Sequence, residues 1–218
     1  TLRVAKELSK SGIKIIIGPV FNENLIYLNE LVDVTFLSLT NKNNNFSKNI
    51  INAGINATSQ LNTIKKFIEL NEIKKTIFLT PDRDYKNEIE KAISSSKIKI
   101  IKNYTYNTDP TKLTNQIEKI TKYKLRKQNL EDEIIRLEES DENNKELLIE
   151  KLKKQDTLGT VDFDSLIIAD FDESLKSVTT SLLYTDISPK KKYFITLNQW
   201  FDESLLNETS SQPLYFPS

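Results

Sequence analysis

Polar and aromatic side chains follow the ends of several predicted strands. Each of these strands is a short β-branched or aromatic run that stops at a turn, and strands of this kind belong to parallel α/β sheets. Ligands bind outside the carboxyl edge of such a sheet. The candidate ligand-binding residues at this edge are Pro19, Phe21, Asn22, Ser38, Thr40, Asp82, Tyr85, Asp170 and Trp200.

The chemistry of these side chains suits a ligand that carries both charges of an amino acid. Hydroxyl and amide groups of Ser38, Thr40 and Asn22, together with helix N-terminal amides, are suited to a carboxylate. The carboxylate of Asp82 or Asp170 is suited to an ammonium group.

Aromatic rings complete the predicted site, and other interpretations stay open. Tyr85 and Trp200 would form an aromatic wall. However, Asp82, Asp84 and Asp170 are also placed to cap helices, a position where Asp is favoured. Burial in a core is the other interpretation of Trp200, because its ring is large and apolar.

The residue types that most often perform catalysis are missing. The 218 residues include no His and no Cys, so the commonest general base and the usual metal or redox ligands are absent. No Gly-rich phosphate loop and no nucleophile-elbow motif is present. Asp82 follows a strand as a phosphoacceptor would, but the chain is too long for a receiver domain and lacks its acidic cluster. We therefore expect a non-enzymatic protein without cofactor or metal.

Charge and hydropathy exclude two further classes. The chain has 31 Lys and Arg and 31 Asp and Glu, a formal net charge of zero, which argues against nucleic acid as a partner. No apolar run reaches membrane length, and the chain starts at Thr1 without a signal peptide. We expect a processed chain whose export signal lay upstream.

Strands and helices alternate along nearly the whole chain. Residues 13–17 are so apolar that we expect both faces of this strand to be covered. Leucines at 25, 28 and 31 predict a helix over residues 22–31, and Gly54 marks a hinge within residues 50–55. Further strands are predicted at residues 32–38, 76–80, 98–106, 163–169 and 192–197. Right-handed crossovers would then place helices on both sides of parallel sheets.

A charged segment interrupts this alternation at residues 110–155. Its apolar residues recur every three or four positions, and a polar break at residues 140–144 predicts two helices that fold back as a hairpin. Two interpretations stay open: an arm for a partner protein or for self-association, and a solvated insertion with a narrow apolar seam.

Several stretches together resemble the type I periplasmic binding proteins. Residues 15–19 (IIIGP) are similar to a strand-end signature, residues 52–60 (NAGINATSQ) to the lobe crossing, and residues 77–85 (IFLTPDRDY) to the start of the second lobe. Lys86 stands where the family usually has Gly. Residues 156–168 (DTLGTVDFDSLII), with residues 198–202 (NQWFD) downstream, resemble the penicillin-binding-protein activator branch of alphaproteobacteria.

The resemblance implies a three-layer αβα fold with two lobes. Residues 1–55 would form part of the first lobe, residues 56–212 the second lobe with the hairpin 110–155, and residues 213–218 a strand returning towards the first lobe. The chain would then be a fragment that lacks the start and the end of the first lobe.

The resemblance also implies a function outside the cytoplasm. Members of the activator branch are periplasmic, often as outer-membrane lipoproteins, and dock onto a peptidoglycan synthase to stimulate it. The alternative is a solute-binding receptor that holds amino acids or small peptides between its lobes for an ABC permease. Neither function involves a cofactor or nucleic acid.

Overall fold

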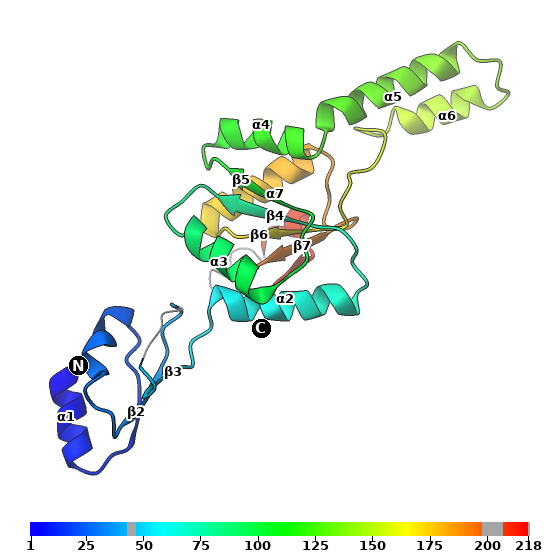
Figure 1. Cartoon of the computed structure of the whole chain (residues 1–218). Coiled ribbons are helices and arrows are strands. Elements are labelled where there is room, and N and C mark those ends of the chain that lie inside the picture. The colour runs from blue at the N-terminus through cyan, green and yellow to red at the C-terminus, as the bar shows by residue number, and fades with distance from the viewer. Residues whose placement is uncertain (43–46, 198–206, 218) are drawn as a thin grey trace.

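Two parallel β-sheets make up the computed structural model of the chain (Figure 1). The structure describes residues 1–42, 47–197 and 207–217. The first sheet has the strand order β1-β2-β3 and the second the order β5-β4-β6-β7-β8, and every neighbouring pair is parallel. The prediction of an α/β fold with parallel sheets is confirmed.

The first sheet is covered on one face only by the described residues. It consists of β1 (Ile15–Ile17), β2 (Thr35–Ser38) and β3 (Ile50–Asn52). Helix α1 (Leu2–Lys10) and the turns that follow β1 share one apolar cluster with this sheet. On the opposite face, Ile15 and Ile17 are 62% and 73% exposed. The expected cover on both faces of β1 is therefore absent here, because α1 and the turns pack on the same side.

Residues 22–31 do not form the predicted helix. Two 3₁₀ turns, η1 (Asn22–Asn24) and η2 (Ile26–Leu28), occupy this stretch instead. The leucines at 25, 28 and 31 are spaced by three throughout, and side chains three apart eclipse in a 3₁₀ helix. The prediction was wrong because a spacing of three without a four does not define an α-helical face.

The second sheet has an apolar centre. Its inner strands are β4 (Thr76–Pro81), β6 (Ser165–Ile168) and β7 (Tyr193–Thr196). Its edge strands are β5 (Lys102–Tyr106) and β8 (Leu214–Tyr215). All residues of β4 and β6 are buried. This burial on both faces explains why these strands are continuous apolar runs.

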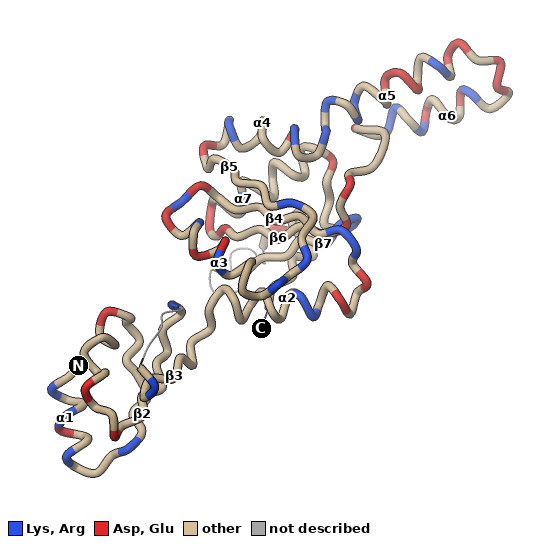
Figure 2. Tube along the Cα trace, viewed as in Figure 1, with Lys and Arg blue, Asp and Glu red and all other residues tan. Residues whose placement is uncertain are grey.

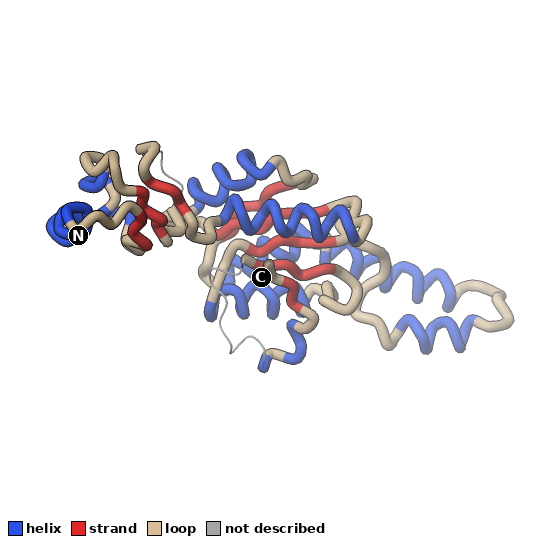
Figure 3. The backbone as a smooth tube through the Cα atoms, turned by 90° about the horizontal axis from the view of Figure 1, so that it is seen from below, coloured by secondary structure: helices blue, strands red, loops and turns tan. Residues whose placement is uncertain are grey.

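Two layers of helices enclose the second sheet (Figure 3). Helices α2 (Ala57–Leu70) and α3 (Lys86–Ser96) pack against each other on one face. Helices α4 (Pro110–Ile120) and α7 (Asp172–Tyr184) pack against each other on the opposite face. The three-layer αβα arrangement is therefore confirmed for this sheet.

Alternating side chains of the inner strands feed the two cores. Ile77 and Leu79 of β4 belong to the apolar cluster beneath α4 and α7, whereas Phe78 belongs to the cluster beneath α2 and α3. In β6, Leu166 and Ile167 divide in the same way. This is the period of two that a strand imposes on its side chains.

The predicted helical hairpin exists, but its bounds differ from residues 110–155. Helix α4 is a separate helix, because Leu113 and Ile117 are fully buried in the core beneath it. The hairpin is made by α5 (Tyr123–Glu138) and α6 (Lys145–Leu152), which pack against each other. We call residues 122–155 the arm, and it extends away from the second sheet (Figure 1).

The segment expected to return towards the first lobe stays with the second sheet. Leu214 and Tyr215 form β8, which pairs in parallel with Phe194 and Ile195 of β7. Tyr215 also packs against Phe67 of α2, with 5.1 Å between ring centroids. Aromatic packing at this edge thus adds β8 to the second sheet.

One segment connects the two sheets in the described chain. A Cβ atom at Gly54 would lie 2.0 Å from the carbonyl oxygen of Thr40, so only glycine fits at this point. Directly afterwards, Asn56 and Ser59 form a capping box in which each side chain accepts from the other residue's backbone N–H. The crossing is therefore fixed at one end by close backbone packing and at the other by a helix cap.

Candidate functional site

Asp170 lies at the centre of the carboxyl edge of the second sheet, just beyond β6. Its side chain is fully buried. The Oδ2 atom accepts hydrogen bonds from the Tyr106 hydroxyl and the Ser174 hydroxyl, both at 2.6 Å. The Oδ1 atom accepts from the Phe171 backbone N–H at 3.0 Å and from the Tyr85 hydroxyl at 3.3 Å. A carboxylate offers about four acceptor positions, so its capacity is filled by the protein.

The two tyrosines hold their protons firmly in this environment. The pKa of Tyr106 is raised far above its ordinary value, first by burial and then by the charge of Asp170. The pKa of Tyr85 is raised by the same two causes in the same order, and Arg83 partly opposes the rise. Both rings therefore remain hydrogen-bond donors to the carboxylate at neutral pH.

Asp82 and Asp84 lie outside this cluster. Asp82 is exposed, and its carboxylate is 3.6 Å from the Lys86 ammonium one helical turn later. No side chain caps α3, whose N-cap residue is Tyr85. The helix-capping interpretation of Asp82 and Asp84 is therefore wrong. Asp170 does not cap α7 either, since Phe171 is the N-cap residue there.

An arginine and two aromatic rings form the exposed part of this edge. The Arg83 guanidinium lies over the Phe171 ring at 5.8 Å from its centroid. The Tyr85 ring lies 5.9 Å from the same ring, centroid to centroid. Arg83 and Phe171 were missed at the sequence level. The only signal for Arg83 was its place in the loop after β4, because the contact with Phe171 joins residues 88 positions apart.

The candidate residues of the first sheet are bonded within their own loops. Ser38 and Thr40 are buried. The Ser38 hydroxyl donates to the Pro19 carbonyl oxygen at 3.1 Å and accepts from the Thr40 backbone N–H at 3.3 Å. The Thr40 hydroxyl accepts from the Lys42 backbone N–H at 3.2 Å. These groups hold the loop ends of β1 and β2 together.

The remaining candidates differ in their exposure. Phe21 is 69% exposed, whereas Pro19 and Asn22 are half-buried. Trp200 lies outside the described residues. The structure thus joins Asp170 with Tyr85, and Ser38 with Pro19 and Thr40, but it places Asp82 apart from the Asp170 carboxylate. Their roles in ligand binding remain predictions.

Tyr106 and Ser174 are the members of the Asp170 cluster that the sequence did not identify. Tyr106 lies in the predicted strand 98–106, and its ring packs in the core beneath α4 and α7, but a strand pattern does not reveal the hydrogen bond of its hydroxyl. In β5, Tyr104 and Tyr106 alternate with the polar residues Asn103 and Thr105, and this alternation is the signal that places Tyr106 on a buried face. For Ser174, the only signal is its place in the first turn of the helix that follows Asp170.

A buried arginine fixes the root of the arm. Arg126 is only 4% exposed. Its Nε donates to the Thr121 carbonyl oxygen at 3.0 Å, its Nη1 donates to the Thr157 hydroxyl at 2.8 Å, and its Nη2 donates to the Thr185 carbonyl oxygen. Burial lowers the pKa of Arg126, and the charge of Asp186 opposes this. The guanidinium therefore ties α5 to the ends of α4 and α7 and to the segment after α6.

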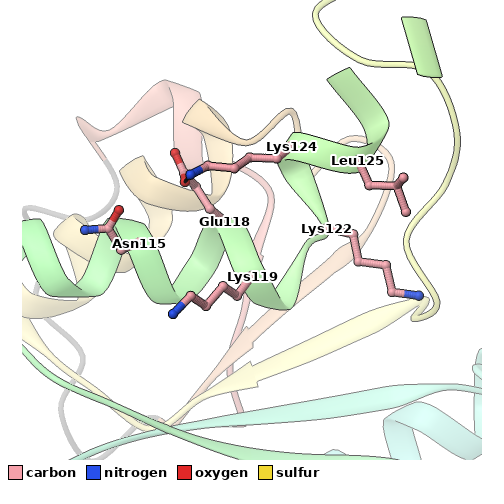
Figure 4. Close-up of a pocket in the computed structure, with 6 residues that line it drawn as sticks. All are labelled: Asn115, Glu118, Lys119, Lys122, Lys124 and Leu125. Atoms are coloured by element: carbon pink, nitrogen blue, oxygen red, sulfur yellow. Dashed lines mark ion pairs between the residues drawn. The ribbon is translucent and has the colours of Figure 1, made fainter. Parts of the chain in front are cut away.

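A hollow of about 470 Å³ lies beside this root, where α4 meets α5 (Figure 4). Glu118 and Lys124 form an ion pair of 3.8 Å across one part of it. Lys119 extends from α4, and Lys122 extends from the turn between α4 and α5. The remaining lining residues are Asn115 and Leu125. The formal charge of the lining is +2, from three lysines and one glutamate, and much of its accessible surface is apolar.

Neither a metal cluster nor a membrane helix is found in residues 1–42, 47–197 and 207–217. No three His, Cys, Asp or Glu side chains gather there to hold a metal ion. No helix in these ranges combines the length and the apolar character of a membrane span.

No protein-family model matches the sequence, and no curated protein matches it either. Solved structures do match. The C-domain of LpoA (YraM) from Haemophilus influenzae, a regulator of PBP1A, has a TM-score of 0.59 at 12% identity over 93% of this chain and 53% of that one. Full-length LpoA from the same organism matches with a TM-score of 0.59 at 12% identity over 96% of this chain.

A transport protein shares the same fold. A periplasmic ligand-binding protein of a branched-chain amino-acid ABC transporter from Burkholderia xenovorans matches with a TM-score of 0.51 at 12% identity, over 96% of this chain and 48% of that one. The chain thus spans about half of the LpoA C-domain and 32% of full-length LpoA. Its parallel sheets and their helix layers have the fold of the type I periplasmic binding proteins.

Proposed function

We propose that the chain is a non-enzymatic periplasmic protein that regulates a peptidoglycan synthase by protein–protein contact. The observation that carries this proposal is the burial and hydrogen bonding of the Asp170 carboxylate. Its carboxylate is fully buried and already accepts four hydrogen bonds from the protein. An ammonium group of a ligand would have to displace one of these donors and would find the carboxylate without access to solvent.

The hydroxyl groups of the first sheet support the same proposal. Ser38 is buried and bonded to Pro19 and Thr40, so it is not presented to a ligand carboxylate. The edge of the second sheet instead presents Arg83 over an aromatic ring. Arginine and aromatic side chains are enriched in protein–protein interfaces. This edge is therefore suited to contact with a protein surface.

The comparisons support the periplasm as the location. Both LpoA, a regulator of PBP1A, and the ligand-binding protein of the transporter share this fold. A lipid anchor on the outer membrane is part of our proposal for the longer protein to which such a chain would belong.

A solute-binding receptor for amino acids or small peptides is the second candidate function. It is favoured by the position of the cluster, since the carboxyl edge of a parallel sheet is where ligands bind in such folds. Phe21, Tyr85 and Phe171 would then form apolar walls around the solute.

Two measurements separate the candidates. In the first, the immobilised chain is incubated with the purified peptidoglycan synthase of the same organism, and retained synthase and its glycan-polymerising rate are measured. We expect retention and a faster rate, and we expect Arg83→Glu to weaken retention more than the matched control Lys66→Glu on exposed α2. No retention at micromolar concentration contradicts the proposal.

In the second measurement, the melting temperature of the chain is determined in the presence of each amino acid and of short peptides. A ligand at 100 times its dissociation constant stabilises the folded state by about 2.7 kcal/mol, which gives a clear upward shift. A shift for one class of solute supports the receptor, and unchanged melting across the panel supports the regulator.

A further inference from the structure

The charge of the arm is divided along its length. Residues 131–148, which we call the acidic tip, contain eight acidic and two basic residues, a formal charge of −6. Residues 119–130, which include the end of α4, and residues 149–155 are the basic root; they contain eight basic residues and one acidic residue, a formal charge of +7. Figure 2 shows this division along α5 and α6. The arm is therefore strongly polarised although the whole chain is neutral.

Apolar side chains are exposed along the same arm. Leu125 at the root of α5 is 57% exposed, Ile135 further along α5 is 52% exposed, and Leu147 at the tip end of α6 is 55% exposed. The seam between α5 and α6 is filled separately by Leu130 and Leu137, which are buried. Single exposed apolar side chains are ordinary on protein surfaces, so these residues add apolar area to an interface that the charges of the arm define.

The root offers a place for an acidic segment to bind. The hollow between α4 and α5 is lined by three lysines and one glutamate, a formal charge of +2, and Glu118 is already paired with Lys124, which leaves Lys119 and Lys122 for a partner (Figure 4). Helix α5 has 16 residues, which corresponds to about 24 Å at 1.5 Å per residue. The far end of the acidic tip therefore lies about one helix length from the hollow and does not enter the hollow of its own chain, although Glu131, the first residue of the tip, is only about 9 Å beyond Leu125 along α5.

We propose that two copies of the chain associate through their arms in antiparallel orientation, so that the acidic tip of each binds the basic root of the other. A two-fold axis across the middle of the arms makes both tip–root contacts identical, as an isologous interface requires. Leu125 of one copy then lies at the same end as Leu147 of the other. A parallel pairing would place −6 against −6 and +7 against +7, and charge repulsion excludes it.

The buried Arg126 makes this interface possible. Its three hydrogen bonds hold the root against α4 and α7, so the arm keeps a fixed direction when it meets its partner. An arm that is already ordered loses less conformational entropy on binding than a flexible one.

The oligomeric state of the purified chain tests this proposal without any synthase. We expect a dimer by sedimentation velocity at about 0.1 M salt. The dissociation constant should rise about tenfold or more at 1 M salt, because the Debye length falls from about 10 Å to about 3 Å. A monomer at both salt concentrations, or a dimer that salt leaves unchanged, overturns the proposal.

Charge reversal gives a sharper test. The tip variant replaces Glu131, Glu139 and Glu146 by Lys, and the root variant replaces Lys119, Lys127 and Lys151 by Glu; none of these six forms an ion pair in the described part of the chain. Each variant alone should be monomeric, because its tip–root contacts change from −6 against +7 to 0 against +7 in the tip variant and to −6 against +1 in the root variant. An equimolar mixture should form a heterodimer that is weaker than the parent dimer, because the unchanged root of the tip variant (+7) still meets the unchanged tip of the root variant (−6). Three reversals elsewhere, K10E, K66E and K99E, should leave the dimer intact.

Cross-linking defines the orientation. The chain has no cysteine, so single cysteines at Asn143 in the tip and Asn115 in the hollow can be joined specifically. We expect a short thiol cross-linker to join a mixture of N143C and N115C, but not N143C to itself. Efficient joining of N143C alone, or dimers formed by each reversal variant on its own, overturns the antiparallel arrangement.

Discussion

Replacing Arg126 by methionine removes the guanidinium while keeping most of the apolar stem of the side chain. Arg126 is 4% exposed and donates to two backbone carbonyl oxygens, those of Thr121 and Thr185, and to the Thr157 hydroxyl. A buried group that loses its partner costs about 1–3 kcal/mol. A hydrogen bond to a charged group contributes about 1.5–3 kcal/mol, and three such bonds are lost here. We therefore expect Arg126→Met to lower the free energy of unfolding by about 4 kcal/mol.

Urea-induced unfolding followed by circular dichroism measures this loss. With a slope of about 2 kcal/mol per molar urea, the midpoint should fall by about 2 M. Limited proteolysis should also cut the arm faster in the variant, because its root is no longer held.

The matched control is Arg136→Met on the same helix. Arg136 forms ion pairs with Glu133 and Glu142, but its side chain is 55% exposed, and ion pairs in solvent contribute little. We expect its midpoint to stay close to that of the parent chain. If both substitutions shift the midpoint equally, or if Arg126→Met shifts it by less than about 0.5 M, the anchoring role of Arg126 is refuted.

Other predictions concern the Asp170 cluster and the crossing between the sheets. Tyr106→Phe removes a hydrogen bond to a buried carboxylate and should cost about 1.5–3 kcal/mol in urea unfolding. Because the pKa of Tyr106 is raised in the folded state, its contribution to stability is complete below the unfolded-state pKa of about 10 and falls at higher pH. Between about pH 9 and 11, the free energy of unfolding should therefore decline less steeply for Tyr106→Phe than for the parent chain. An identical decline in both chains contradicts the raised pKa. Gly54→Ala places a Cβ 2.0 Å from a backbone oxygen and should lower the free energy of unfolding by about 1–3 kcal/mol. An unchanged melting temperature would contradict this prediction. Asn56→Ala removes the cap of α2 and should cost about 1 kcal/mol, whereas Asn56→Ser should retain most of it.

The sequence was most informative where a strand is buried on both faces. Residues 76–80 and 163–169 were predicted as strands from their β-branched and apolar runs, and β4 and β6 lie there. Local composition suffices for these elements because covered parallel strands require apolar residues at every position.

The helices were harder to place where two periods compete or where charges dominate. The spacing of three at Leu25 and Leu28 indicated an α-helix, yet the chain forms 3₁₀ turns there. The charge density around Leu113 and Ile117 grouped α4 with the solvated arm, although these two side chains are fully buried. Whether a helix is buried depends on the element that packs against it, which for α4 is α7. The residues of α4 alone do not show that α7 lies beside it.

The candidate site was predicted in position but not in chemistry. The sequence placed Asp170 and Ser38 at strand ends, which is correct. It could not predict that Tyr106, which is 64 positions before Asp170, would donate to that carboxylate, because this bond depends on β5, β4 and β6 lying side by side. Pairing of strands distant in sequence therefore decides whether a polar side chain is available to a ligand.

The bonds of Arg126 also set an order of events as the chain emerges from its N-terminus to its C-terminus. The hairpin of α5 and α6 is complete by residue 152, and its own contacts are local. One acceptor of Arg126 lies 59 positions further along the chain than the arginine itself. At about 5–20 residues per second, these 59 residues take about 3–12 s to appear. During that interval the guanidinium has no access to Thr185, so the arm forms early and docks late, and nascent arms are exposed to one another before they are anchored.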